Sequence, residues 1–102
     1  MYDIKNLGRL KQLEVLAPET AKAFWTFDKA AWADGAIPKK YKELMAIALA
    51  LTTQCPYCIE LHTNKARESG ASDAEIAEAI LAAAALRAGG AVTHGTHALA
   101  GA

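Results

Sequence analysis

The chain has 102 residues, with 11 basic and 11 acidic side chains and a formal net charge of zero at neutral pH. This length predicts a single domain, residues 1–102, with a modest hydrophobic core. The balanced charge leaves no basic stripe for nucleic acid or membrane headgroups, which argues against both as partners.

Three features of the sequence indicate the cellular compartment of the protein: its N-terminus, its apolar runs and its cysteines. The N-terminal residues lack the long apolar core of a signal peptide, and no apolar run is long enough to span a bilayer. Two cysteines without an export signal favour the reducing cytoplasm, where such a pair is redox-active or metal-binding rather than structural. We therefore expect a cytoplasmic protein.

Two helices are expected before the middle of the chain. The first covers about residues 4–16, where leucine and isoleucine recur every third residue and form one apolar edge. Pro18 starts the second, since the N–H that proline lacks would be unpaired there, and Asp34-Gly35 ends it in a turn. Its aromatic residues are expected to form core or subunit contacts or, alternatively, an apolar wall over a reactive site. They are Phe24, Trp25, Phe27 and Trp32.

A third helix is expected from Pro38 to about residue 53, and Glu43 lies inside its apolar part. Glu43 shares a stripe with Ile47 and Ala50, so we expect it to be partly buried. Burial would raise its carboxyl pKa toward neutrality, which suits a proton shuttle. The alternative is a surface ion pair with a nearby lysine of the same helix. The expected apolar side of this helix consists of Tyr41, Leu44, Met45, Ala48 and Leu51.

Both cysteines lie in one short motif, Cys55-Pro56-Tyr57-Cys58, at the start of a central fourth helix. Pro56 suits the first helical position, which makes Cys55 the N-cap and puts Cys58 in the first turn. The helix dipole and the unpaired N–H groups stabilise negative charge there, so the thiol pKa values are expected to fall. His62 lies one turn after Cys58 on the same face, where it can take the Cys58 proton.

The last third of the chain is expected to form a long helix and a short one. The fourth helix ends at Gly70, and a capping box at residues 72–75 starts the fifth. That helix runs to about residue 88 and becomes apolar on all sides, so we expect a subunit interface there. Gly89-Gly90 breaks the pattern before a short last helix. His94 and His97 are assigned to solvent or an interface, with a role beside the thiols as the alternative.

The order Glu43, Cys55-x-x-Cys58, His62 resembles the active-site signature of the alkylhydroperoxidase D-like proteins of the carboxymuconolactone decarboxylase superfamily. The flanking sequences DGAIPKKYKEL and HTNKARESGASDAEIAEAI are similar as well. The resemblance covers roughly residues 17–88. It implies a compact helical domain of about six helices and a homo-oligomer, either a trimer or a hexamer.

The resemblance also implies a role for each residue of the motif. Cys58, the second cysteine, attacks the peroxide, and Cys55 then resolves the product as a disulfide. Glu43 and His62 correspond to the proton relay of the family. The best-known members carry a histidine between the cysteines, where this sequence has Tyr57. We expect Tyr57 to line the pocket or contact a neighbour rather than to relay protons. The decarboxylases of the superfamily lack the cysteine pair, which argues against that activity.

The sequence therefore predicts an all-α thiol peroxidase that reduces hydroperoxides through a Cys55/Cys58 dithiol–disulfide cycle. Its partners are a hydroperoxide and an external dithiol reductant of thioredoxin-like or lipoyl type, and no bound cofactor is required.

Two alternatives stay open. One is a disulfide carrier without peroxidase activity. The other is a metal-binding or purely structural helical oligomer, with zinc held by Cys55, Cys58, His62 and one further histidine.

Glutaredoxin also carries Cys-Pro-Tyr-Cys, but its fold needs a strand before the motif and a proline after it, and this sequence offers neither.

Overall fold

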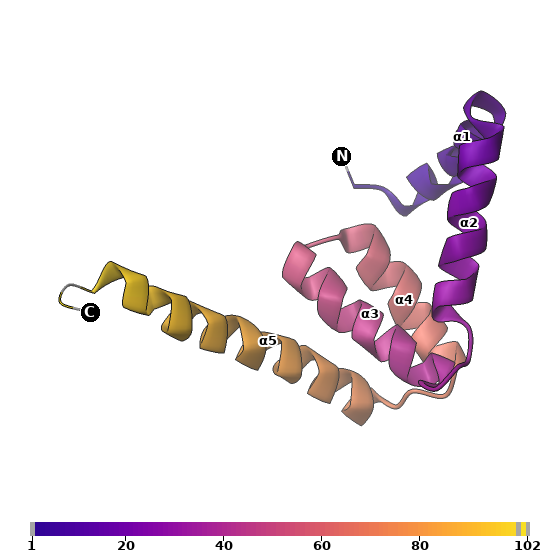
Figure 1. Ribbon diagram of the computed structural model, residues 1–102. Coiled ribbons are helices and arrows are strands. Elements are labelled where there is room, and N and C mark those ends of the chain that lie inside the picture. Colours follow the sequence, from indigo (N-terminus) through magenta and orange to yellow (C-terminus); the bar gives the residue numbers. More distant parts are fainter. Residues whose placement is uncertain (1, 100, 102) are drawn as a thin grey trace.

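The computed structural model describes residues 2–99 and 101, and helices joined by short turns make up this part of the chain (Figure 1). No strand occurs among these residues, so the predicted all-α class is confirmed. The α-helices are α1 (Lys11–Leu16), α2 (Pro18–Trp32), α3 (Lys39–Thr53), α4 (Pro56–Glu68) and α5 (Asp73–Gly95), and two 3₁₀ segments, η1 (Ile4–Leu10) and η2 (Thr96–Ala98), flank them.

The core lies where α3, α4 and the first part of α5 meet. Only Gln54 and Cys55 connect α3 to α4, and Gln54 turns the chain with a left-handed φ of 58°. Alanines at buried positions of both helices leave room for a close approach. The apolar cluster between the three helices consists of Ile47, Ala66, Ala71 and Ile76, with Leu44 and Leu51 packed against it.

The buried face of α3 differs in part from the predicted apolar side. Ile47 and Ala50 are buried beside Glu43, as their shared stripe predicted. Tyr41 and Met45, expected on the apolar side, are about half exposed. The reason is that α4 and α5 cover only the face of α3 that carries Glu43.

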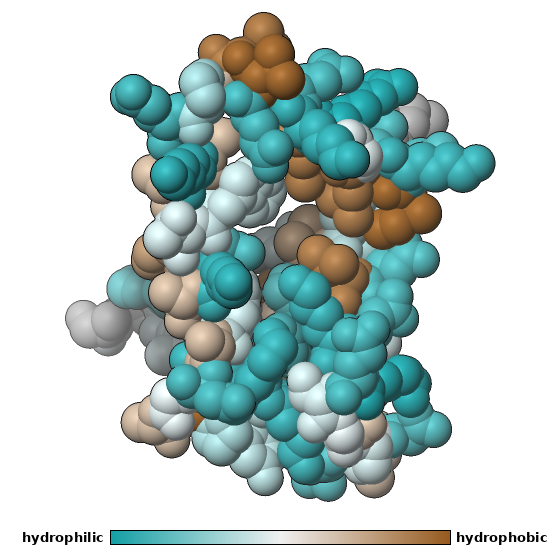
Figure 2. Space-filling model, turned by 90° about the vertical axis from the view of Figure 1, so that its right-hand side faces the viewer, coloured by the Kyte–Doolittle hydropathy of each residue, from teal (hydrophilic) through white to brown (hydrophobic). Residues whose placement is uncertain are grey.

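The N-terminal region is a 3₁₀ segment followed by a short α-helix, rather than one α-helix over residues 4–16. Its apolar residues recur every third position, and a helix with three residues per turn aligns that pattern on one edge. α1 and α2 then form a hairpin that stands to one side of the core and contacts it through the C-terminal part of α2 (Figure 1). Apolar side chains gather at the top of this hairpin (Figure 2).

The fifth helix begins as predicted but does not break at Gly89-Gly90. Ser72 accepts a hydrogen bond from the N–H of Glu75 at 3.1 Å, and the Glu75 side chain accepts one from the N–H of Ser72 at 2.9 Å. The helix then continues to Gly95. Neither Gly89 nor Gly90 has a positive φ. Each therefore weakens the helix only by about 1 kcal/mol relative to alanine and does not end it.

α5 runs outward from the core, and we call its part over residues 81–95 the arm (Figure 1). Leu81, Leu86 and Val92 on the arm are 66%, 75% and 76% exposed. The molecule is accordingly elongated, with extents of 57 × 33 × 30 Å and a radius of gyration of 17.3 Å. A compact domain of this length has a radius of about 13 Å. Arg87 fastens the arm to the core, because its guanidinium donates to the carbonyl of Thr52 at 2.6 Å in the last turn of α3.

The segment Asp73–Ala98 is long and apolar enough to cross a membrane by length and composition alone. This differs from the prediction that no apolar run reaches such a length, because the helix continues through Gly89. Only 11% of this segment is buried within the single chain, but one such helix is weak evidence for a membrane span, since length and composition are all that the test considers. The arm by itself therefore does not indicate a membrane location.

Gly89→Ala should stabilise the protein if α5 is continuous. An added Cβ at Gly89 meets no atom within 4 Å, so the free energy of unfolding should rise by about 0.5–1 kcal/mol. Gly70→Ala is the matched control, because Gly70 has a φ of +92° and alanine there should cost about 1–2 kcal/mol. Urea unfolding measures both changes. A less stable Gly89→Ala protein would contradict the continuous helix.

Candidate functional site

The cysteine motif occupies the start of α4, as the sequence predicts. Cys55 is the N-cap with an extended backbone, and Pro56 is the first helical residue. The Sγ of Cys55 accepts a hydrogen bond from the backbone N–H of Cys58 at 3.4 Å. Both sulfur atoms therefore lie at the positive end of the helix dipole, which favours negative charge.

The two thiols lie against each other, and this contact makes them unequal. Their Sγ atoms are 2.7 Å apart, and both cysteines are free. The hydrogen bond with Cys58 lowers the pKa of Cys55 below its ordinary value of 9.0. The same contact, together with burial and the charge of Cys55, raises the pKa of Cys58 to about 11. The expected fall in the thiol pKa is therefore wrong for Cys58, because one negative charge in the pair opposes a second.

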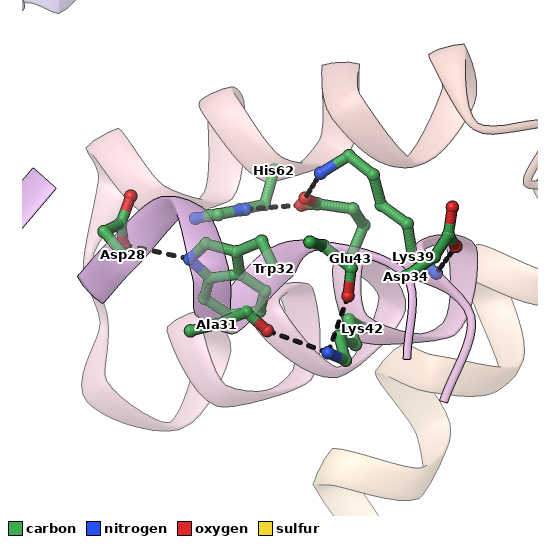
Figure 3. A network of polar contacts seen from close by, with 9 residues as sticks. Asp28, Ala31, Trp32, Asp34, Lys39, Lys42, Glu43 and His62 are labelled. Carbon is green, nitrogen blue, oxygen red and sulfur yellow. Dashed lines mark hydrogen bonds and ion pairs between the residues drawn. The ribbon is translucent and has the colours of Figure 1, made fainter. Parts of the chain in front are cut away.

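Glu43 and His62 form the buried centre of the site (Figure 3). Oε2 of Glu43 lies 2.6 Å from Nδ1 of His62, and Oε1 accepts a hydrogen bond from Nζ of Lys39 at 2.8 Å. Glu43 is 0% exposed, and His62 is buried as well. Glu43 thus pairs with Lys39 of its own helix, as the alternative predicted, but the pair is not a surface one, because Glu43 is buried. Its role as a proton shuttle stays a prediction.

The pKa of Glu43 is shifted in the direction opposite to the expected one. Burial raises this pKa, but the hydrogen bonds with Lys39 and His62 lower it by more, so that it lies below its ordinary value of 4.5. Glu43 therefore stays ionised and can only accept, which puts the hydrogen of the contact on Nδ1 of His62. A neutral His62 then presents Nε2 as its basic nitrogen.

His62 and Cys58 line the same small cavity, of about 160 Å³. Cys55 and Glu43 are not part of its wall. Larger hollows of about 450 and 340 Å³ lie beside Trp25 on the α1–α2 hairpin, but no thiol or histidine lines them, so we assign the site to the smaller cavity. Its other walls come from α2 and α3 and consist of Trp32, Ala46, Leu49, Ala50 and Thr53.

Trp32 is the aromatic residue that forms a wall of the site. Its ring lies 4.8 Å from the His62 ring, centroid to centroid, at an interplanar angle of 46°. The indole Nε1 donates to Oδ1 of Asp28 at 3.0 Å. Phe24 and Phe27, from the same predicted aromatic group, are exposed. Sequence reasoning did not single out Asp28, although its spacing of four residues from Trp32 on one helix is the signal that could have found it.

Tyr57 contacts the N-terminal segment of its own chain and not the thiol cavity. Its hydroxyl accepts a hydrogen bond from Nδ2 of Asn6 at 2.9 Å, and its ring packs edge-on against Tyr2 at 4.8 Å. This agrees with the expectation of a neighbour contact. Tyr57 is not among the residues that line the cavity of Cys58 and His62.

His94 and His97 lie near the C-terminal end of the arm, with ring centroids 5.9 Å apart. In the part of the chain that the structure describes, no three His, Cys, Asp or Glu side chains lie together as metal ligands. The zinc alternative required one of these histidines beside the thiols. A single chain does not assemble such a site.

Comparison with known proteins identifies the family. The profile named Carboxymuconolactone decarboxylase family matches residues 18–101, which include the cysteine pair, Glu43 and His62. The chain belongs to this family.

Two relatives show how members of the carboxymuconolactone decarboxylase family resemble this protein. A Paracoccus denitrificans protein named "Uncharacterized protein 4 in cox locus" is 50% identical over 78 residues, which are 76% of this chain and 70% of that protein. An alkyl hydroperoxide reductase of Mycobacterium tuberculosis is 34% identical over 88 residues. That match covers 83% of this chain but only 25% of the reductase.

Two solved structures share the fold of this family member. A carboxymuconolactone decarboxylase family protein from Legionella pneumophila has a TM-score of 0.74 and 35% identity, and the match covers 78% of this chain and 71% of that one. A protein from Methanobacterium thermoautotrophicum has a TM-score of 0.77 and 30% identity, covering 88% of this chain and 97% of that one. The family and the all-helical fold predicted from the sequence are therefore confirmed, whereas the single chain is elongated rather than compact as predicted.

Glu43 should contribute stability that is present at neutral pH and lost in acid. Its folded pKa lies below 4.5, so its contribution is complete above that pH and is lost as the pH falls through the folded pKa. Glu43→Gln should lower the free energy of unfolding by about 1–3 kcal/mol at neutral pH, because Lys39 and His62 then face a neutral amide. The difference from wild type should shrink as the pH falls toward about 3.

Urea unfolding at a series of pH values measures this difference. Glu78→Gln is the control, since Glu78 is an exposed glutamate on α5, and it should change stability little at any pH. Equal acid sensitivity of the wild type and the Glu43→Gln protein would contradict the buried ion pair.

Proposed function

We propose that the protein is a thiol peroxidase that reduces hydroperoxides through a Cys55/Cys58 dithiol–disulfide cycle. The observation that carries the proposal is that Cys58 and His62 line one cavity, with the buried carboxylate of Glu43 behind the histidine. Family membership and the relative named alkyl hydroperoxide reductase support the same chemistry.

His62 acts as the base for Cys58 in the first step. Because the contact with Cys55 raises the pKa of Cys58, little of this thiol is ionised at neutral pH, so a base within reach is needed. His62 accepts the Cys58 proton at Nε2, and the ionised Glu43 stabilises the resulting imidazolium. The sulfur attacks the distal oxygen of the peroxide, so that an S–O bond forms and the O–O bond breaks. The leaving alkoxide takes the proton from His62, and Cys58 is left as a sulfenic acid.

Cys55 completes the cycle. Its pKa is lowered and its sulfur lies 2.7 Å from that of Cys58, so it can attack the oxidised sulfur as a thiolate. The disulfide forms, and the hydroxyl group leaves as water after taking up a proton. An external dithiol of thioredoxin-like or lipoyl type then reduces the disulfide by exchange. Two thiols and one hydroperoxide give a disulfide, an alcohol and water, so no bound cofactor is required.

A disulfide carrier is the second candidate, and the lowered pKa of Cys55 favours it. In that reaction the Cys55 thiolate attacks the disulfide of a partner protein, and no peroxide takes part. Cys58 must then attack the resulting mixed disulfide to release the partner as a thiol, so a base beside Cys58 serves the carrier as well. The relative named alkyl hydroperoxide reductase favours the peroxidase.

Single-residue variants should separate the roles of the two thiols. Cys58→Ser should abolish the reaction with peroxide. Cys55→Ser should react once, at least as fast as the wild type, because Cys55 is the largest cause of the raised Cys58 pKa, and should then stop at a sulfenic acid. His62→Ala should slow the first step by about 10²–10⁴-fold without preventing disulfide closure by an added oxidant. Mass spectrometry after a peroxide pulse with a dimedone-type trap measures the sulfenic acid.

Glu60→Gln is a matched control, because Glu60 is two residues beyond Cys58 but is exposed, and it should leave the labelling unchanged. Label on Cys55 in the Cys58→Ser protein, with none on Cys58 in the reverse variant, would reverse the assignment. No label in either variant would favour the carrier.

We also propose that the protein forms a homo-oligomer, a trimer or a hexamer, through the arm of α5. The exposed apolar side chains of the arm support this, since soluble monomers rarely expose large contiguous apolar patches. Ala84→Glu, at an exposed position of the arm, should dissociate or unfold the protein. Ala74→Glu is the control, because an acidic residue in the first turn of a helix is favourable. Sedimentation that shows a stable wild-type monomer at micromolar concentration would refute the assembly.

A further inference from the structure

One hydrogen bond does not fix the ring of His62. Glu43 holds the imidazole at Nδ1, but the χ2 torsion of histidine is broad, so the direction of Nε2 stays open. The proposed first step needs Nε2 within hydrogen-bond reach of the Cys58 proton. A second contact must therefore hold the plane of the ring.

Trp32 supplies that second contact. Its indole lies beside the imidazole, as Figure 3 shows, with the ring centroids 4.8 Å apart and the planes at 46°. Trp32 also lines the cavity together with Cys58 and His62. The indole thus limits rotation of the imidazole from the side where the thiol and the substrate would lie.

Trp32 is in turn held at two points. Its Nε1 donates to Oδ1 of Asp28 at 3.0 Å, one turn earlier in α2. Its backbone lies in the last turn of α2, where Nζ of Lys42 donates to the carbonyls of Ala31 and Ala33 at 3.0 and 2.7 Å. Lys42 directly precedes Glu43 in α3. The helix that supplies the carboxylate therefore also fixes the end of the helix that supplies the indole.

We propose that Trp32 is a positioning residue of the Cys58–His62–Glu43 relay and that its hydrogen bond to Asp28 keeps the indole in position. The indole holds the plane of His62 so that Nε2 faces Cys58. The kinetic consequence of this inference rests on the proposed peroxidase function, whereas the contact between Trp32 and His62 is testable without any activity.

Two substitutions at Asp28 separate its hydrogen bond from its charge. Asp28→Asn keeps an oxygen acceptor for the indole N–H and removes the charge, so the rate of Cys58 oxidation by peroxide should stay within about twofold of wild type. Asp28→Ala removes the acceptor and should slow that step about tenfold, and Trp32→Leu should slow it about a hundredfold, as expected for misplacement of a catalytic group. Both Asp28 variants should stay folded, and disulfide closure by an added oxidant should be unchanged in both. A wild-type rate for Asp28→Ala, or equal loss in both Asp28 variants, would overturn the positioning role.

Fluorescence tests the contact itself. In a Trp25→Phe background, Trp32 is the remaining tryptophan. This background should fold, because the buried Nε1 of Trp25 has no hydrogen-bond partner to lose. An imidazole ring in contact with an excited indole quenches its emission by accepting an electron. The emission of Trp32 should therefore rise when His62 is replaced by glutamine in this background, because the two ring centroids lie 4.8 Å apart.

Asp28→Ala in the same background should also raise the emission, because it loosens the contact between the two rings. Equal emission with and without His62 would overturn the inference. If the wild-type protein does not react with peroxide, the proposed function fails and with it the kinetic role. The fluorescence comparison would still decide whether Trp32 holds His62.

Discussion

The contact between Glu43 and His62 decides how the helices of the core are arranged. Glu43 is a charged group without access to solvent, and an unpaired buried charge costs several kcal/mol. Both of its oxygens are used, one by Lys39 of the same helix and one by His62 of α4. The second bond fixes the rotation of α4 relative to α3. Because Cys58 lies one turn before His62 on α4, the same rotation brings both side chains to one cavity.

The parts of this structure that could be predicted from the sequence depend on residues within a turn of one another. The N-cap at Cys55, the capping box that begins at Ser72 and the left-handed Gly70 are of this kind. The burial of Glu43 also followed from its stripe with Ile47 and Ala50. The family resemblance predicted, without any geometry, that Glu43 and the cysteines belong to one site. The role of each residue in the reaction remains a prediction.

The parts that could not be predicted depend on contacts between elements or between paired groups. Burial alone raises a carboxyl pKa, but the partners of Glu43 are supplied by the packed helices and reverse the shift. The helix dipole alone lowers a thiol pKa, but the 2.7 Å contact between the sulfur atoms outweighs it for Cys58. Trp32 reaches the site only because α2 ends against α3. In α5, Gly89 and Gly90 weaken the helix locally. They do not end it, because there is no proline and no left-handed residue at that point.

The short sequence separation between Glu43 and His62 has an entropic consequence. Glu43 and His62 are 19 residues apart in the chain. The entropy lost when two groups are brought together grows with the logarithm of the loop between them, by about 0.6 kcal/mol for each doubling. A pair of residues from the two ends of this chain would close a loop more than two doublings longer, and bringing them together would cost about 1.4 kcal/mol more. The order of the residues along the chain thus contributes directly to the preorganisation of the site.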